Sequence, residues 1–241
     1  MRRYWSVMLL GARGVCGKLL ALLALLAVLA ASEAVLVALR GLPAACLSNL
    51  LQGSCLSYAF RAALLALAVI CCLWGSDLLG GVRCRYTLER LRVGELTVVV
   101  LWGLCYALAF LILMGFQLVC LLAVSRWYLA AGSGTAGPQS LFLAAYADPL
   151  FHALLPLEDW GLYVRNGMYA LSLGLCCSMW SFWSRRSGWG WALYGVAALA
   201  AITFPSGIGS ESGGLVLGLV ALAVALGALV PVWKEARRGE D

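Results

Sequence analysis

The chain has 241 residues, of which 63% are hydrophobic and only 12% are charged, and its mean hydropathy is +0.94. This composition excludes a soluble globular domain, because too few polar side chains are available to cover the surface. The formal charge of +6 does not indicate a nucleic-acid partner, since the basic residues are spread over four separate patches. We therefore expect an integral membrane protein that contacts the lipid bilayer and no nucleic acid.

Apolar stretches of the length that a bilayer requires, about 20 residues each, recur along the whole chain. The six predicted spans are residues 15–39, 56–79, 96–124, 162–182, 189–208 and 214–233. No segment alternates with the period of a strand, and backbone groups in lipid must be hydrogen-bonded within their own segment. The sequence thus predicts an all-α polytopic membrane protein with six transmembrane helices, forming a single transmembrane domain over residues 1–241.

Basic residues flank an aromatic and apolar stretch, residues 4–10, ahead of the first span. This pattern predicts an amphipathic helix at the membrane interface. A cleaved signal peptide is the competing interpretation. We favour an uncleaved anchor, because the first span is longer than a signal-peptide core and Glu33 and Arg40 stand where a small-residue cleavage site would be.

The distribution of Lys and Arg predicts the orientation. With the N-terminus inside and six alternating spans, thirteen basic residues are cytoplasmic: Arg2, Arg3, Arg13, Lys18, Arg83, Arg85, Arg90, Arg92, Arg185, Arg186, Lys234, Arg237 and Arg238. Four are outside, at Arg40, Arg61, Arg126 and Arg165. This bias places both termini in the cytoplasm, and we expect the four outer arginines to snorkel to the interface from helix ends.

The most highly charged segment, residues 80–95, lies between the second and third spans and contains four arginines and two glutamates. A helix over residues 84–94 would place Arg85, Glu89 and Arg92 along one side, and Leu88 and Leu91 on a neighbouring face. These leucines require either lipid or a protein groove. The segment is therefore either a connector on the membrane surface or a docking helix for a cytoplasmic partner.

The outer connection between the third and fourth spans, residues 126–160, is long. A Gly- and Ser-containing part at 130–138 precedes a semi-apolar part at 139–160 that Asp148, Pro149 and Pro156 interrupt. We expect one or two short helices on the outer interface. They would form either an outer gate or a cap that packs over the bundle.

Polar side chains within spans are few, and such groups usually face a bundle interior or an aqueous path. Gln117, Asp77 and Asn166 are the candidates for a translocation path. Several carboxylates near the midplane, which would indicate an ion-coupled carrier, are not evident, and the two halves show no convincing repeat. An ion-coupled secondary transporter is therefore the alternative reading.

The residues do not predict an enzyme or a metal site. Six of the ten cysteines lie in apolar runs and are interpreted as packing residues: Cys71, Cys72, Cys105, Cys120, Cys176 and Cys177. The chain has one histidine, His152, which is too few for the usual metal-ligand clusters. A serine-histidine catalytic pair is not predicted either, because His152 does not follow a candidate serine along the chain in the expected order. A Walker-type nucleotide loop is also absent from the sequence. Whether Cys46 and Cys55 form a disulfide is left open.

The stretch RYTLERLRVGE at 85–95, between spans two and three of a six-span chain, resembles the coupling-helix region of permease subunits of type-2 ATP-binding-cassette (ABC) exporters. The large outer insertion differs, because the better-known members carry their external element between spans five and six. The resemblance implies a bacterial cytoplasmic membrane permease without a cofactor of its own, a second permease copy, and cytoplasmic ATPase subunits that hold ATP and Mg. The coupling residues would be Arg85, Tyr86, Thr87, Leu88, Glu89, Arg90, Leu91 and Arg92. A non-transporting membrane scaffold or immunity protein is a further alternative.

Overall fold

The computed structural model describes residues 2–39, 51, 54–75, 93–131, 138–156, 159–186, 190–204 and 211–238. Within these ranges all regular secondary structure is helical. The helices are α1 (Arg2–Leu39), α3 (Leu56–Gly75), α5 (Glu95–Ala131), α6 (Pro138–Ala147), α7 (Pro149–Leu154), α8 (Trp160–Arg186), α9 (Trp191–Thr203) and α10 (Glu211–Arg238).

Four of these helices, α1, α3, α5 and α10, are long and apolar enough to cross a membrane. The predicted spans 162–182 and 189–208 fall on α8 and α9. At about 1.5 Å per residue, the 13 residues of α9 rise about 20 Å, less than the roughly 30 Å of a bilayer core. In the part of the chain that is described, the fold is therefore a helical bundle with four membrane-length apolar helices.

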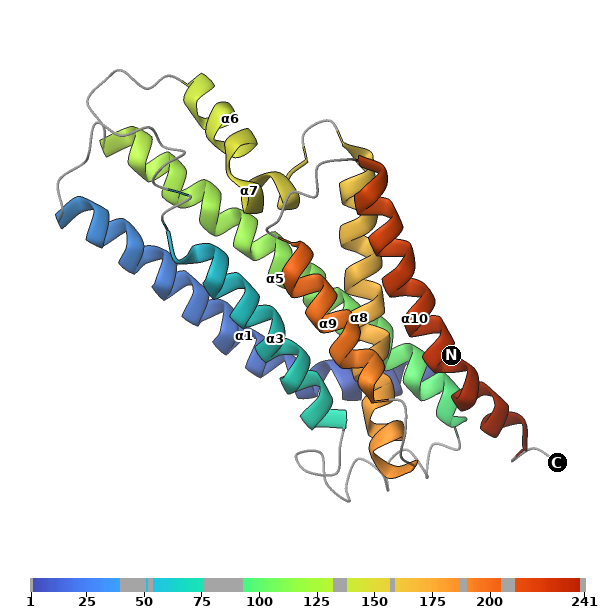
Figure 1. Cartoon of the computed structure of the whole chain (residues 1–241). Helices are drawn as coiled ribbons and strands as arrows, with labels where there is room; N and C mark the ends of the chain where they lie inside the picture. Colours follow the sequence, from blue (N-terminus) through green and yellow to red (C-terminus); the bar gives the residue numbers. More distant parts are fainter. Residues whose placement is uncertain are drawn as a thin grey trace.

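Helix α8 lies at the centre of the bundle (Figure 1), packed against α5, α10, α3 and α9. Ten of the eleven residues from Tyr169 to Met179 are buried. A helix enclosed by protein does not need an apolar surface for lipid, which explains why α8 carries more polar residues than its neighbours. The long helix with the most polar composition is thus the central element of this bundle.

The crossing of α5 and α8 depends on small residues. Gly174 of α8 lies directly against the backbone of Gly103 and Ala107 in α5. A Cβ atom added at Gly103 would approach Leu175 Cδ2 to 2.7 Å. Small residues spaced four apart allow two helix backbones to come together closely. This contact determines how near the central helix lies to α5.

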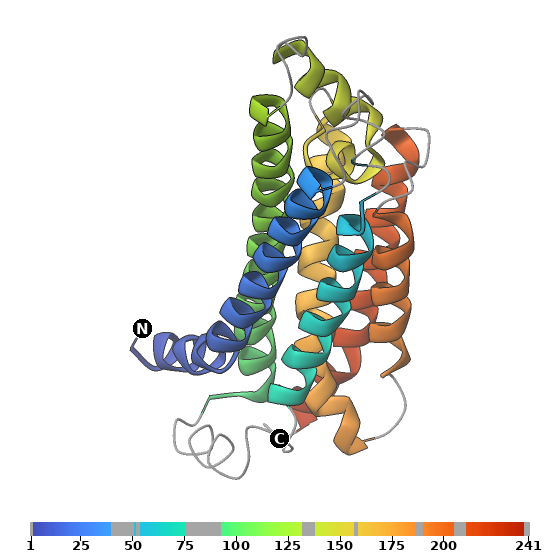
Figure 2. The same cartoon turned by 90° about the vertical axis from the view of Figure 1, so that its left-hand side faces the viewer.

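Helix α1 is continuous from Arg2, and its first part turns away from the axis of the remainder (Figure 2). The helix predicted ahead of the first span is therefore the bent beginning of one 38-residue helix that includes this span. Trp102 Nε1 of α5 donates a hydrogen bond to the carbonyl oxygen of Val7 over 3.0 Å, and its ring fills the space beside Gly11. Trp5, on this first part, is 60% exposed. The bend is thus held against α5 on one side and open on the other.

The ends of the helices gather at two opposite ends of the bundle. The short helices α6 and α7, which the sequence predicts within residues 126–160, lie at one end (Figure 1). The last turn of α3, the first turn of α5 and the last turns of α8 and α10 lie at the other end. Successive long helices therefore run in alternating directions.

Candidate functional site

A cluster of polar residues occupies the first turns of α8. Its members are Arg165, Asn166 and Tyr169, together with Thr203 at the end of α9. The helix starts at a side-chain cap, because Asp159 Oδ1 accepts hydrogen bonds from the backbone N–H groups of Gly161 at 2.8 Å and Leu162 at 3.3 Å. This cap sets where α8 begins and places Arg165 and Tyr169, four residues apart, on one face.

Arg165 is buried, with only 2% of its surface exposed. Its Nη2 and Nε donate to Asn166 Oδ1 at 3.2 and 3.4 Å, and its guanidinium carbon lies 5.5 Å from the ring centre of Phe204. The expectation that Arg165 snorkels to the outer interface is therefore wrong. Gly214 and Gly218 of α10 lie against it, and their lack of side chains lets α10 cover the arginine.

Asn166 connects α8 to the outer short helix α7. Its Nδ2 donates to the carbonyl oxygen of Ala153 over 2.7 Å, while its Oδ1 accepts from Arg165. Both ends of the amide are thus engaged, as a buried amide requires. The candidate path residue Asn166 is consequently part of a fastening between the bundle and α7.

Tyr169 connects α8 to α9 and α3. Its hydroxyl lies 2.9 Å from Thr203 Oγ1, which itself donates to the carbonyl oxygen of Leu199 over 2.7 Å. Because Thr203 has a single hydroxyl proton, the Tyr169 hydroxyl is the donor of their shared bond. The ring of Phe204 makes tilted contacts with the rings of Tyr169 and Phe60, at ring-centre distances of 6.2 and 5.3 Å. One polar and aromatic cluster therefore joins four helices at the end that carries α7.

The α7 helix depends on Asp148, whose buried side chain accepts the backbone N–H of Phe151 over 2.9 Å. Burial raises the pKa of the Asp148 carboxyl, and the bond from Phe151 partly opposes this. The ring of His152 contacts that of Tyr146 at 5.2 Å. His152 Nδ1 has no hydrogen-bond partner among the described residues.

Gln117 lies elsewhere, fully buried in the middle of α5. Its Nε2 donates to the carbonyl oxygen of Leu56 over 3.5 Å, and its Oε1 has no partner within the described ranges. Glu33 of α1 accepts the backbone N–H of Cys55 over 3.1 Å. Gln117 and Glu33 thus both bind the start of α3, whereas Asn166 binds α7.

The remaining predicted site residues, Asp77 and the coupling residues 85–92, lie outside the described part of the chain. So does Cys46, while Cys55 is an exposed free thiol. No group of three or more metal-ligating side chains occurs within the described ranges.

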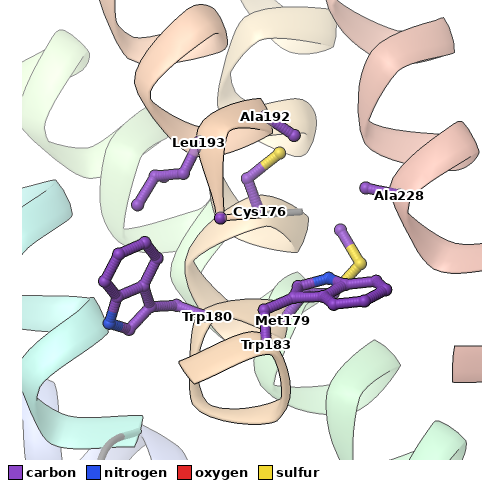
Figure 3. Close-up of a pocket in the computed structure, with 8 residues that line it drawn as sticks. Cys176, Met179, Trp180, Trp183, Ala192, Leu193 and Ala228 are labelled. Carbon is purple, nitrogen blue, oxygen red and sulfur yellow. The ribbon is translucent and has the colours of Figure 1, made fainter. Parts of the chain in front are cut away.

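A small hollow lies between α8, α9 and α10 (Figure 3). Its wall is apolar and aromatic, and is formed by Cys176, Met179, Trp180, Trp183, Gly190, Ala192, Leu193 and Ala228. Trp180 also makes an edge contact with Tyr194 at 5.6 Å. No charged side chain is among the described residues that line this hollow, and the groups on its wall that can donate a hydrogen bond are the indole N–H groups of Trp180 and Trp183 and the Cys176 thiol.

The sequence indicated Asn166 but missed that Arg165, Tyr169 and Thr203 belong with it. The spacing of Arg165 and Tyr169, one helical turn apart, could have indicated that the two belong together. No feature of the sequence indicated that Thr203 joins them. In the comparisons with known proteins, no family model, no curated protein and no solved structure matches this chain.

Proposed function

We propose that this chain is the transmembrane permease subunit of an ABC exporter, which couples ATP hydrolysis on a separate ATPase to export of a substrate. One observation carries the proposal. Helix α3 ends and α5 begins at the same end of the bundle, so that residues 80–95 join them there, at the end where α8 and α10 also finish. The arginine-rich segment and the basic C-terminus thus belong to one end, which we assign to the cytoplasm.

In this proposal the chain crosses the bacterial cytoplasmic membrane six times. Helices α8 and α9 are the fourth and fifth spans, and both termini are cytoplasmic. The alternation of helix directions supports this topology. The short α9 lies against α8 and α10, which shield it from lipid on those sides.

The coupling step would begin at Leu88 and Leu91, seated in a groove of the ATPase, with the surrounding Arg and Glu residues at its rim. ATP and Mg are bound by the partner, so this chain needs only to transmit motion. Helix α5 begins at Glu95 and continues without interruption for 37 residues. Because it packs closely on α8, movement at its first turn would reach the central helix.

The substrate path would lie between this chain and a second permease copy. Of the candidate polar residues Gln117, Asp77 and Asn166, Gln117 and Asn166 are buried within this chain and bind α3 and α7. In the proposal these two position the helices beside the path, and Asp77 is the candidate to line it. In the proposal α7 is a gate at the outer end, and the bond from Asn166 holds it closed on the bundle. Opening that gate would require the bonds of Asn166 to Ala153 and Arg165 to break.

The test is purification of the tagged chain from its native membrane, followed by identification of co-purifying proteins and measurement of ATP hydrolysis. We expect a Walker-motif ATPase that the double substitution Leu88→Asp with Leu91→Asp removes, with membrane insertion unchanged. The matched control is Phe142→Asp with Leu143→Asp, which places the same charges on exposed residues of α6 at the opposite end. It should retain the ATPase.

Retention of an active ATPase by the Leu88 and Leu91 variant would refute the coupling assignment. Ion-driven flux by the isolated chain without ATP would instead identify a secondary transporter. Absence of both flux and ATPase would identify a scaffold or immunity protein.

A further inference from the structure

A buried positive charge lies at the end of the bundle that carries α7. The Arg165 guanidinium donates from Nε and Nη2 to Asn166 Oδ1, which is a neutral acceptor, and only 2% of the residue is exposed. Within the described part of the chain, its Nη1 has no hydrogen-bond acceptor and the guanidinium forms no ion pair. The rings of Phe204 and Tyr169 lie 5.5 and 6.0 Å from the guanidinium carbon and offer only their π faces. A buried charge is strongly unfavourable unless an opposite charge compensates for it.

The carboxylates described near this end bind backbone groups instead. Asp159 accepts the N–H groups of the first turn of α8, and Asp148 accepts the N–H of Phe151 in α7. Neither of these bonds leads to Arg165. A buried guanidinium that no described carboxylate compensates is the arrangement expected of a site for a bound anion.

The Nη1 atom lies beside the beginning of α10. A Cβ atom added at Gly214 would be 4.0 Å from Nη1, and α10 begins only one turn earlier, at Glu211. Helices α8 and α10 start side by side at this end of the bundle (Figure 1). Because Gly214 has no side chain, a ligand group that reaches the first turn of α10 can lie next to Nη1.

The position of Arg165 along α8 identifies the source of the anion. At about 1.5 Å per residue, α8 rises about 31 Å from Arg165 to its last residue, Arg186, close to the roughly 30 Å of a hydrocarbon core. Trp160 and Tyr163, just before Arg165, are exposed, and their ring centres are 6.1 Å apart. Exposed aromatic residues of this kind are enriched at the membrane interface. The anionic group that a membrane supplies at this level is the phosphate of a phospholipid.

We propose that Arg165 binds the phosphate group of a phospholipid in the leaflet at the α7 end, through Nη1 and the remaining hydrogen of Nη2. A phosphodiester has a single negative charge, so it neutralises the guanidinium without leaving a net charge in the bundle. Arginine can donate to two phosphate oxygens at once, while Asn166 holds the other edge of the guanidinium in place. Farther along α10, the exposed apolar residues Val216 and Val220 are available to the acyl chains.

The experiment measures, by native mass spectrometry, which lipid the full-length protein retains in detergent. Phosphatidylglycerol competes with a galactosyl diacylglycerol that has the same acyl chains but no phosphate. We expect a preference for phosphatidylglycerol of about tenfold or more, the usual effect of a hydrogen bond between charged groups. Arg165→Gln should abolish this preference. Arg126→Gln, which removes the same charge from an exposed site on α5, should keep it; an equal loss in both variants would indicate a general effect of surface charge and overturn the site.

A second variant keeps Arg165 and supplies the opposite charge from within the chain. Asn166→Asp places a carboxylate where the amide oxygen accepts from Nε and Nη2. The guanidinium is then neutralised, so the preference for phosphatidylglycerol should fall to that of Arg165→Gln. Size-exclusion profiles and melting temperatures establish that both variants are folded. If folded Asn166→Asp retains phosphatidylglycerol as the wild type does, an uncompensated charge is not the basis of binding and the proposal is wrong.

Two further measurements exclude other counter-ions. Inorganic phosphate in excess should not displace phosphatidylglycerol; displacement would show that the site takes a soluble oxyanion and would overturn the lipid assignment. The chain also has Glu158 before α8 and Glu211 at the start of α10. Glu158→Gln with Glu211→Gln should leave the preference unchanged, and a preference that appears only in this double variant would identify the chain's own carboxylates as the counter-ion. None of these measurements requires the ATPase, so the lipid site and the proposed function fail separately.

Discussion

Gly174 of α8 lies directly against the backbone of Gly103 in α5. An added Cβ at Gly174 would also approach the backbone nitrogen of Ala107, which cannot move without displacing the helix. The central helix therefore has its position because two residues without side chains meet there. Four predictions follow from this and the other contacts of α8, α5 and α7.

Gly174→Ala should destabilise the protein by about 1 to 3 kcal/mol, the usual effect of overpacking a close contact. The control is Gly167→Ala on the same helix, where the added Cβ meets nothing within 4 Å. That change should be neutral or stabilising by up to about 1 kcal/mol, because Ala favours a helix more than Gly. Thermal unfolding in detergent, followed by size exclusion, measures both. Equal melting temperatures for the two variants would contradict the close crossing.

Trp102→Phe should loosen the first part of α1. The substitution keeps an aromatic ring beside Gly11 but removes the hydrogen bond to the Val7 carbonyl oxygen. We expect faster amide hydrogen exchange in residues 4–14 with little change in α8. Trp127→Phe is the control, since Trp127 is 38% exposed near the opposite end of α5. Unchanged exchange in residues 4–14 would show that packing alone holds the bend.

Asp148 should make the stability of α7 depend on pH. Its folded-state pKa is raised by burial, so the folded state binds its proton more tightly than the unfolded state does. The resulting stabilisation is fully present below the ordinary pKa of Asp, about 3.9, and is lost as pH rises through the raised folded value. Asp148→Asn keeps an oxygen to accept the Phe151 N–H and should remove this dependence.

Asp148→Ala, by contrast, removes the cap and should lose about 0.5 to 2 kcal/mol at neutral pH. Amide exchange in α7, measured from below the ordinary pKa of Asp, about 3.9, up to neutral pH, separates the three proteins. If the exchange of α7 in Asp148→Asn depends on pH as it does in the wild type, another group is responsible for the dependence.

Asn166 should have two separable roles. Asn166→Ala removes the bond to the Ala153 carbonyl oxygen and leaves the buried Arg165 without its acceptor, so a loss of about 3 kcal/mol is expected. Asn166→Asp restores an acceptor for Arg165 but cannot donate to Ala153. It should therefore keep most of the stability while exposing α7 to exchange and proteolysis.

Ser172→Ala is the control for this pair, because the Ser172 hydroxyl donates only to Met168 within its own helix. It should leave α7 protected. If Asn166→Asp protects α7 as well as the wild type does, the proposed fastening of α7 is wrong.

The lengths and apolar composition of the segments were sufficient to predict where the helices lie. The predicted spans 15–39, 56–79 and 96–124 coincide with parts of α1, α3 and α5, because a long apolar stretch in a membrane must satisfy its own backbone. One or two short helices in the outer insertion were also predicted, because Asp148 and Pro149 interrupt a crossing helix; in the structure this pair begins α7.

The sites were less predictable because their residues come from separate helices. Arg165 stands near a helix end, where snorkelling is the usual outcome, and only the glycines of α10 allow that helix to cover it. Tyr169 contacts Thr203, 34 positions away, and the Cys177 thiol of α8 contacts the carbonyl oxygen of Ala68 in α3, 109 positions away. No local pattern links such partners.

The sequence by itself therefore determined the class of protein and the helical segments, because hydropathy and backbone hydrogen bonding act along one segment at a time. Only the tertiary structure decided which helix is central, which arginine is buried and which hydroxyl Tyr169 contacts. Those properties depend on what surrounds a side chain, and the surroundings of α8 are supplied by α3, α5, α9 and α10. The energy of a polar group in a bundle is determined by its neighbours, so it cannot be read from the segment that carries it.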